Sequence, residues 1–184
     1  KPYFELFNVL EKGVFYAATC LYGITFKKRT DLPVYHPDVV VYELFEADGS
    51  PLGLYYGDFY TRESKRGGAW MSELVTPSKL FGQKPVIYNV CNYTPPTQAL
   101  PCLLTYSEVE TLFHEFGHAL HAFFAEQQYA TLAGTAVARD FVEFPSQFNE
   151  YWALHEQILP HYAHHYQTQE VISDALIEKL KNSR

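Results

Sequence analysis

Between residues 39 and 91, the hydrophobic and polar positions are typical of strands. Runs rich in β-branched and aromatic residues predict strands at 39–45, 52–60 and 85–91. The segment 47–51, Ala-Asp-Gly-Ser-Pro, has the composition of a turn and predicts a hairpin between the first two strands. This part of the chain is therefore expected to form a small antiparallel sheet.

Helical spacing dominates the remainder. Apolar residues at helical intervals predict a helix over 5–22 that ends at Gly23, and from residue 107 onward the pattern predicts helices. A small sheet followed by helices is an α+β arrangement, here mainly helical.

At 184 residues the chain is long enough for one domain with a sizeable core. We expect that domain to have three parts: a helix and connector in 1–34, a small β-rich part in 35–106, and a helical part in 107–184.

One predicted helix has a well-defined apolar face. Ser107, followed three residues later by Glu110, matches a capping box and predicts a helix start near residue 108. Seven apolar residues then share one stripe of that helix: Val109, Leu112, Phe113, Phe116, Leu120, Phe123 and Phe124. Gly117 lies in mid-helix, where glycine costs up to about 1 kcal/mol relative to alanine, so we expect something to pack closely there.

The polar side of this helix carries the pattern HExxH. His114 and His118 are four residues apart, so both imidazoles project from one face, where they can share a zinc ion. Glu115 points elsewhere and can act as a base instead of a ligand. The alternative is an amphipathic helix with two solvated histidines.

A zinc site that keeps one position open usually takes a third protein ligand. His121 lies about 10 Å along the axis from His114, too far to share its ion. Phe124 occupies the last position of HExxHxxGxxH, which excludes the metzincin class. The carboxylate or imidazole must then come from a second helix. Spacing leaves four candidates: Asp140, Glu143, Glu150 and His155.

Glu143 is our choice among these four. The alternative is that Asp140 and Glu143 form a capping pair that only starts the second helix. The same helix is expected to carry a set of apolar residues into the core: Phe141, Val142, Phe144, Phe148, Tyr151 and Trp152.

Composition excludes several classes of partner. The net charge is −7 and no large cluster of Lys and Arg is present, so neither nucleic acid nor an anionic membrane surface is expected to bind. No apolar run reaches the length of about 18 residues that a membrane span requires. The three cysteines form no CxxC pair and indicate reduced thiols in a cytoplasmic protein.

The motifs resemble one known family. HEFGHALH, followed by ATLAGTAVARDFVEFPSQFNEYW, resembles the thimet oligopeptidase family of zinc metallopeptidases, and most of all its branch of bacterial dipeptidyl carboxypeptidases. GDFYTRESKRGGAWM, NVCNYTPP, YSEVETLFHEFGH and YAHHYQT resemble further blocks of that branch. The likeness implies a zincin-like catalytic core with one Zn²⁺ held by His114, His118 and Glu143, and Glu115 as the general base.

The same resemblance implies a substrate class. Short peptides would be cut to release C-terminal dipeptides; the alternatives are endo-acting cleavage, or a zinc-binding fragment without activity. Members of the family are several times longer, with a helical roof over the cleft and substrate-binding residues further downstream, so the chain is expected to be a piece. A full-length monomer in the cytoplasm is expected.

Secondary roles follow for a few other residues. In related peptidases an edge strand pairs with the substrate, which suggests Cys91, Asn92 and Tyr93 for that contact; the alternative is an interior strand. Glu110 and Asp140 are candidates for orienting the imidazoles, or simply helix caps. Gly134 lies between the two metal helices, where it either touches substrate or belongs to a plain connecting loop.

Overall fold

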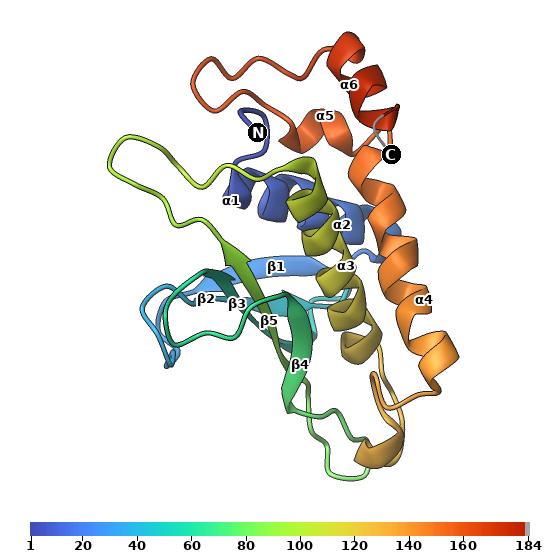
Figure 1. The fold of residues 1–184 in the computed structure, drawn as a ribbon. Coiled ribbons are helices and arrows are strands. Elements are labelled where there is room, and N and C mark those ends of the chain that lie inside the picture. Colours follow the sequence, from blue (N-terminus) through green and yellow to red (C-terminus); the bar gives the residue numbers. More distant parts are fainter. Residues whose placement is uncertain (183–184) are drawn as a thin grey trace.

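The computed structural model describes residues 1–182 and contains one five-stranded sheet with helices packed against it (Figure 1). The strands are β1 (Thr25–Arg29), β2 (Val40–Phe45), β3 (Pro51–Tyr60), β4 (Trp70–Val75) and β5 (Val86–Tyr93). Their order is β1-β2-β3-β5-β4, so the chain passes the position of β5 to build β4 and then returns. Because of that return, β3 and β5 are parallel, while the other neighbours are antiparallel.

The helices begin and end within the described residues as follows. They are α1 (Leu6–Val9), the π-helical segment η1 (Leu10–Phe15), α2 (Tyr16–Tyr22), α3 (Tyr106–Phe123), the 3₁₀ turn η2 (Ala130–Leu132), α4 (Arg139–Glu150), the 3₁₀ turn η3 (Tyr151–Leu154), α5 (Leu159–Tyr162) and α6 (Asp174–Lys181).

The main core lies between the sheet and these helices. Tyr55 and Ile87 from the sheet, Phe116 from α3 and Leu10 from η1 are all completely buried in one cluster. Strand residues that alternate with them, such as Val41 and Tyr56, point to the other face and form a small second cluster. No helix among residues 1–182 combines the length and apolar character needed to cross a bilayer.

The α+β class, the first helix and the hairpin with its turn at 47–51 are confirmed, but the sheet is mixed instead of antiparallel. Two strands were missed. Four of the five residues of β1, Thr-Phe-Lys-Lys-Arg, are polar, and β4 mixes polar and apolar residues without clean alternation. Each lies at an edge of the sheet, where a strand needs less apolar surface.

The N-cap of α3 lies two residues before the predicted one. The capping box uses Thr105 and Glu108: the Glu108 amide donates to Oγ1 of Thr105, and the Thr105 amide donates to Oε2 of Glu108. Ser107 and Glu110 therefore lie inside the helix, and the prediction for them was wrong. Six residues of the predicted stripe are buried, while Phe124 ends the helix and is 37% exposed.

Helix α4 is turned differently from the prediction. Phe141, Phe144, Phe148 and Tyr151 are exposed, not buried in the core. The helix instead packs through its small side chains, and Ser146 and Asn149 are its buried residues. It starts after Ala138 without a side-chain cap, so the capping role considered for Asp140 is also wrong.

Candidate metal centre

Three side chains from two helices converge on one point. Nε2 of His114 and Nε2 of His118, both on α3, lie 3.2 and 3.1 Å from Oε2 of Glu143 on α4. Ligands about 2.0–2.1 Å from a tetrahedral zinc ion are about 3.3 Å from one another, so these spacings suit such an ion. Among residues 1–182 this is the group of His, Cys, Asp and Glu side chains whose geometry could hold a metal.

The two helices can meet because Gly117 has no side chain. A Cβ atom at this position would lie 2.7 Å from Cα of Ser146 and 2.9 Å from the carbonyl oxygen of Pro145. Both contacts are to backbone, which cannot move aside as a flexible side chain would. The close packing expected at Gly117 is therefore confirmed, and it brings Glu143 within reach of both imidazoles.

Two asparagines hold the backbone of α3 on either side of His114. Nδ2 of Asn149, on α4, donates to the carbonyl oxygen of Phe113 at 2.6 Å. Nδ2 of Asn89, on β5, donates to the carbonyl oxygen of Glu115 at 3.1 Å. Both amides are buried, so these bonds are shielded from water. The rotation of α3 is thereby fixed against the sheet and against α4.

Ser146 orients the third candidate ligand. Its hydroxyl lies 2.9 Å from Oε2 of Glu143 and from the Glu143 carbonyl oxygen. Burial alone would raise the pKa of Glu143, but the Ser146 hydroxyl and the two imidazoles outweigh it and lower the pKa. Burial also lowers the pKa of His118. Both shifts favour the deprotonated forms that bind metal.

Glu150 contacts the far side of His114. Its Oε1 lies 2.6 Å from Nδ1 of that ring, which leaves Nε2 to face Glu143. The orienting role considered for Glu110 and Asp140 stays a prediction, whereas the contact of Glu150 with His114 is present. Glu150 could have been found, since it lies seven residues after Glu143 and thus on the same face of α4.

Glu115 lies beside the three converging side chains and is 6% exposed. Burial raises its pKa to about 7, while the charge of His114 and a backbone hydrogen bond from Met71 act in the opposite direction. Its Oε2 has no hydrogen-bond partner among the described residues. A carboxyl group with a pKa near neutrality can both accept and return a proton.

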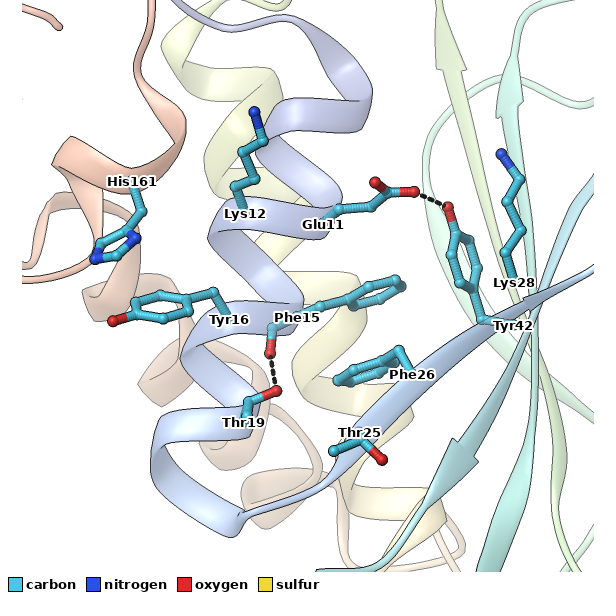
Figure 2. Close-up of a pocket in the computed structure, with 10 residues that line it drawn as sticks. All are labelled: Glu11, Lys12, Phe15, Tyr16, Thr19, Thr25, Phe26, Lys28, Tyr42 and His161. Carbon is cyan, nitrogen blue, oxygen red and sulfur yellow. Dashed lines mark hydrogen bonds between the residues drawn. The ribbon is translucent and has the colours of Figure 1, made fainter. Parts of the chain in front are cut away.

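The space in front of these groups is a cavity of about 440 Å³. Its walls are formed by the three candidate ligands and by a further set of residues: Glu115, Ala69 just before β4, Trp70 and Met71 at the start of β4, Thr135 and Val142. A similar hollow of about 490 Å³ lies between α2 and β1 (Figure 2). Its single histidine, His161, is stacked on Tyr16, so it offers no comparable set of ligands.

The strand next to the metal cavity is β4, not β5. β5 lies between β3 and β4, but its pairing with β4 ends at Val90, just before Cys91, Asn92 and Tyr93. This order favours the interior-strand alternative, and a substrate contact by these three residues stays a prediction. Cys91 and Tyr93 are buried. The free edge lies instead at β4, the outer strand on this side of the sheet, which was not predicted.

Gly134 is buried behind β4, where a Cβ atom would clash with the carboxylate of Glu73. Its neighbour Thr135 lines the metal cavity. The loop between α3 and α4 therefore reaches the site through Thr135, and the position of Gly134 fits the plain connecting role.

Comparison with known proteins gives the family of the chain. The family model for peptidase family M3 matches residues 1–184. Dipeptidyl carboxypeptidase of Escherichia coli is 56% identical over 183 residues, covering 100% of this chain and 27% of that protein. Dipeptidyl carboxypeptidase of Salmonella typhimurium is 54% identical over the same shares of the two chains. Oligopeptidase A of Escherichia coli is 41% identical over 184 residues, covering 98% of this chain and 27% of that protein. The chain spans about a quarter of the length of these relatives.

Proposed function

Because this chain belongs to peptidase family M3, we propose that it supplies the zinc-binding centre of a peptidase that releases dipeptides from the C-terminal ends of short peptides. The observation that carries the proposal is the convergence of His114, His118 and Glu143 beside a buried Glu115. We place this centre with the zincin-like metallopeptidases.

His114, His118 and Glu143 would hold one zinc ion. When bound, zinc polarises a peptide carbonyl and makes a water molecule more acidic. Glu115 accepts the proton of the attacking water, because its carboxylate is desolvated and within the same cavity. It then delivers that proton to the leaving amine, which a pKa near 7 makes feasible in both directions.

The β4 edge would position the peptide. Its outer backbone groups are available for pairing, and its first two residues line the metal cavity. Backbone pairing of this kind recognises an extended chain largely independently of side-chain identity. It suits an enzyme that accepts many short peptides. We expect the protein to act as a cytoplasmic monomer.

Endo-acting cleavage is the alternative, favoured by the 41% identity to an oligopeptidase A. Product analysis on peptides with free and blocked C-termini separates the two. A zinc-binding scaffold without activity is the other alternative. It predicts that the 184-residue chain binds zinc but hydrolyses nothing, while the longest natural form that contains these residues is active.

The substitution Glu115→Gln tests the mechanism. We expect zinc content to remain at one ion per chain while peptide hydrolysis by the longest natural form falls by orders of magnitude, because an amide cannot take the proton. Unchanged turnover in this variant would exclude Glu115 as the base. Loss of zinc together with activity would instead assign Glu115 to the metal site.

A further inference from the structure

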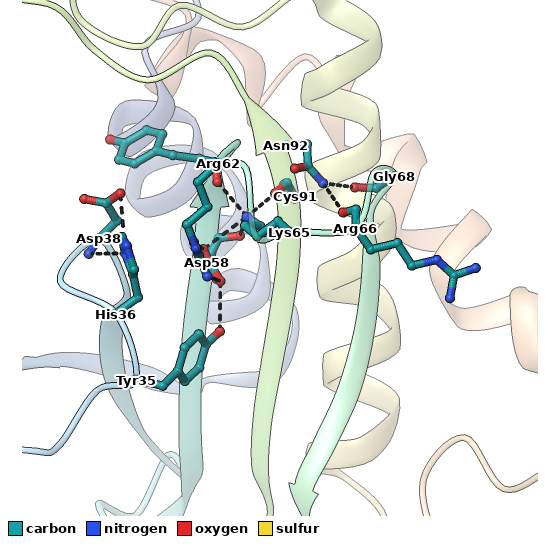
Figure 3. Close-up of polar contacts among 11 residues, drawn as sticks. Tyr35, His36, Asp38, Asp58, Arg62, Lys65, Arg66, Gly68, Cys91 and Asn92 are labelled. Atoms are coloured by element: carbon teal, nitrogen blue, oxygen red, sulfur yellow. Dashed lines mark hydrogen bonds and ion pairs between the residues drawn. The ribbon is translucent and has the colours of Figure 1, made fainter.

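The segment between β3 and β4, residues 61–69, is anchored at its base by a buried carboxylate (Figure 3). Both terminal nitrogens of Arg62 lie 2.7 Å from the carboxylate oxygens of Asp58, which is 2% exposed. Nζ of Lys65 donates to Oδ1 of Asp58 and to the backbone carbonyl oxygens of Asp58, Tyr60 and Cys91. These bonds tie the start of the loop to β3 and β5.

The far end of the loop is held by Asn92. Its side-chain amide donates to the carbonyl oxygens of Arg66 at 2.9 Å and of Gly68 at 2.8 Å (Figure 3). Gly68 has φ +96°, which side-chain-bearing residues rarely adopt, and a Cβ at Gly67 would meet nothing within 4 Å. The loop is thus held firmly from the sheet side and open on the other.

Residues 61–69 expose two charged side chains, Glu63 and Arg66, and Arg66 is the exposed cation. Its side chain is exposed, and Figure 3 shows it extending past β4 on the side away from β5. Arg29 and Arg62 are both bound by carboxylates, whereas within residues 1–182 no carboxylate forms an ion pair with Arg66. An anchored guanidinium without a protein partner is suited to bind an external carboxylate.

Charge differs between the two ends of the β4 edge. Arg66 lies before the strand, and Glu73 lies in its second half with one carboxylate oxygen buried and unpartnered among the described residues. A short peptide carries an ammonium at one end and a carboxylate at the other. Its carboxylate end is therefore favoured near Arg66, which orients the peptide antiparallel to β4.

Chain length matches this orientation. Met71 and Glu115 line the same cavity as the candidate metal ligands, so we take Met71 to mark the level of the cleaved bond. Two extended residues beyond that bond span about 7 Å, which places a terminal carboxylate near Gly68 and Ala69. Arg66 is two residues from Gly68 and has a side chain long enough to reach that position.

We propose that Arg66, positioned by Asn92, binds the free C-terminal carboxylate of the peptide substrate and thereby sets cleavage two residues from that end. Arg66 is a specificity-determining residue, and Asn92 is a positioning residue that acts through it. The inference rests on the proposed peptidase function and names the substrate class as peptides with a free C-terminal acid.

The first test compares one peptide as its free acid and as its C-terminal amide, in the longest natural form of the protein. Arg66→Ala is expected to lower kcat/KM for the acid about 10- to 100-fold, mostly through KM, as for a lost hydrogen bond to a charged group. The kcat/KM for the C-terminal amide should change less than about twofold. Lys27→Ala, which removes one charge from β1 at the opposite edge of the sheet, is the control.

Asn92→Ala should reproduce the selective rise in KM for the acid, since the loop loses two hydrogen bonds while Arg66 remains. A purely structural role of Asn92 would affect acid and amide alike. An equal loss for both peptides in Arg66→Ala would overturn the proposal.

A binding measurement separates this inference from the proposed function. In the zinc-loaded Glu115→Gln background, titration calorimetry gives the Kd of the uncleaved acid and amide. A preference for the acid that Arg66→Ala removes supports the carboxylate site even if the parent protein hydrolyses neither peptide. Hydrolysis in the parent with no acid preference in either assay overturns the carboxylate site alone.

Discussion

Oε1 of Glu150 lies 2.6 Å from Nδ1 of His114, although 36 residues separate the two in the chain. The contact joins α3, which carries both histidines, to α4, which carries the candidate carboxylate ligand. It fixes which ring nitrogen of His114 faces the metal position. Outer contacts of this kind are part of a metal site as much as its ligands are.

Replacing Glu150 should therefore weaken zinc binding. We expect Glu150→Gln to raise the zinc Kd about 10- to 100-fold, because the imidazole loses the carboxylate that orients it and makes it more basic. Competition with a chromophoric chelator measures this. Glu156→Gln, an exposed carboxylate after η3, is the matched control, and an unchanged Kd in Glu150→Gln would contradict the role.

Glu143→Ala should reduce zinc binding more strongly, since it removes a ligand and leaves two imidazoles. Zinc content after mild chelation, measured by atomic absorption, distinguishes the variant from the parent. Intact zinc content would point to a different third ligand.

Zinc should also stabilise the fold, because the ion bridges α3 and α4. Binding to the folded state alone adds about 2.7 kcal/mol when free zinc is 100 times its Kd. Thermal unfolding with and without zinc is expected to show a rise in Tm that His118→Ala abolishes. An equal rise in that variant would place the stabilising ion elsewhere.

The crossing of α3 and α4 should not tolerate a methyl group at Gly117. Helix propensity alone favours alanine by about 1 kcal/mol, but the added Cβ would lie 2.7 Å from the backbone of Ser146. Overpacking of that kind costs about 1–3 kcal/mol, so a net loss of stability is expected in urea unfolding. Gly67→Ala, which adds a Cβ in open space, should be nearly neutral by comparison.

Asp58 should make the free energy of unfolding depend on pH. Burial acts to raise its pKa, but hydrogen bonds from Arg62 and Lys65 outweigh burial, and the pKa lies below its ordinary 3.8. The contribution of the Asp58 carboxylate to the free energy of unfolding is thus complete above pH 3.8. It is lost as the pH falls through the lowered pKa.

Asp58→Asn leaves two cations without their carboxylate and should cost about 3–5 kcal/mol near neutral pH. The difference in free energy of unfolding between this variant and the parent, measured with denaturant, should become smaller below pH 3.8. A gap that stays constant down to pH 2 would mean that Asp58 titrates alike in both states.

The metal site was predictable where it depends on local sequence. HExxH lies on one helix, so the spacing of His114, Glu115 and His118 predicts their relative positions directly. Spacing alone could not identify Glu143, since it left four candidates for the third ligand, and the family resemblance decided among them. Ser146 and Glu150 were missed in their roles because these depend on how α4 is rotated about Gly117.

That rotation also explains the error over the aromatic residues of α4. Phe144 and Phe148 are apolar at helical spacing, which favours burial in any pattern analysis. Ser146 and Asn149 occupy the inner face because only small side chains fit against α3 there. The position of β4 was missed for a similar reason: sheet order is set by pairing between distant segments, which no local period encodes.

Asn89 and Asn149 donate hydrogen bonds to the carbonyl oxygens of Glu115 and Phe113, on either side of His114. These two bonds limit how far α3 can move relative to the sheet and to α4. A hinge between the sheet and the histidine-bearing helix would break a shielded bond on one side or the other. If the proposed peptidase function holds, the motions that admit substrate and release product must occur outside this frame, in the segments that face it across the cavity. The side of the cavity formed by α3 and the sheet is then the part that does not move.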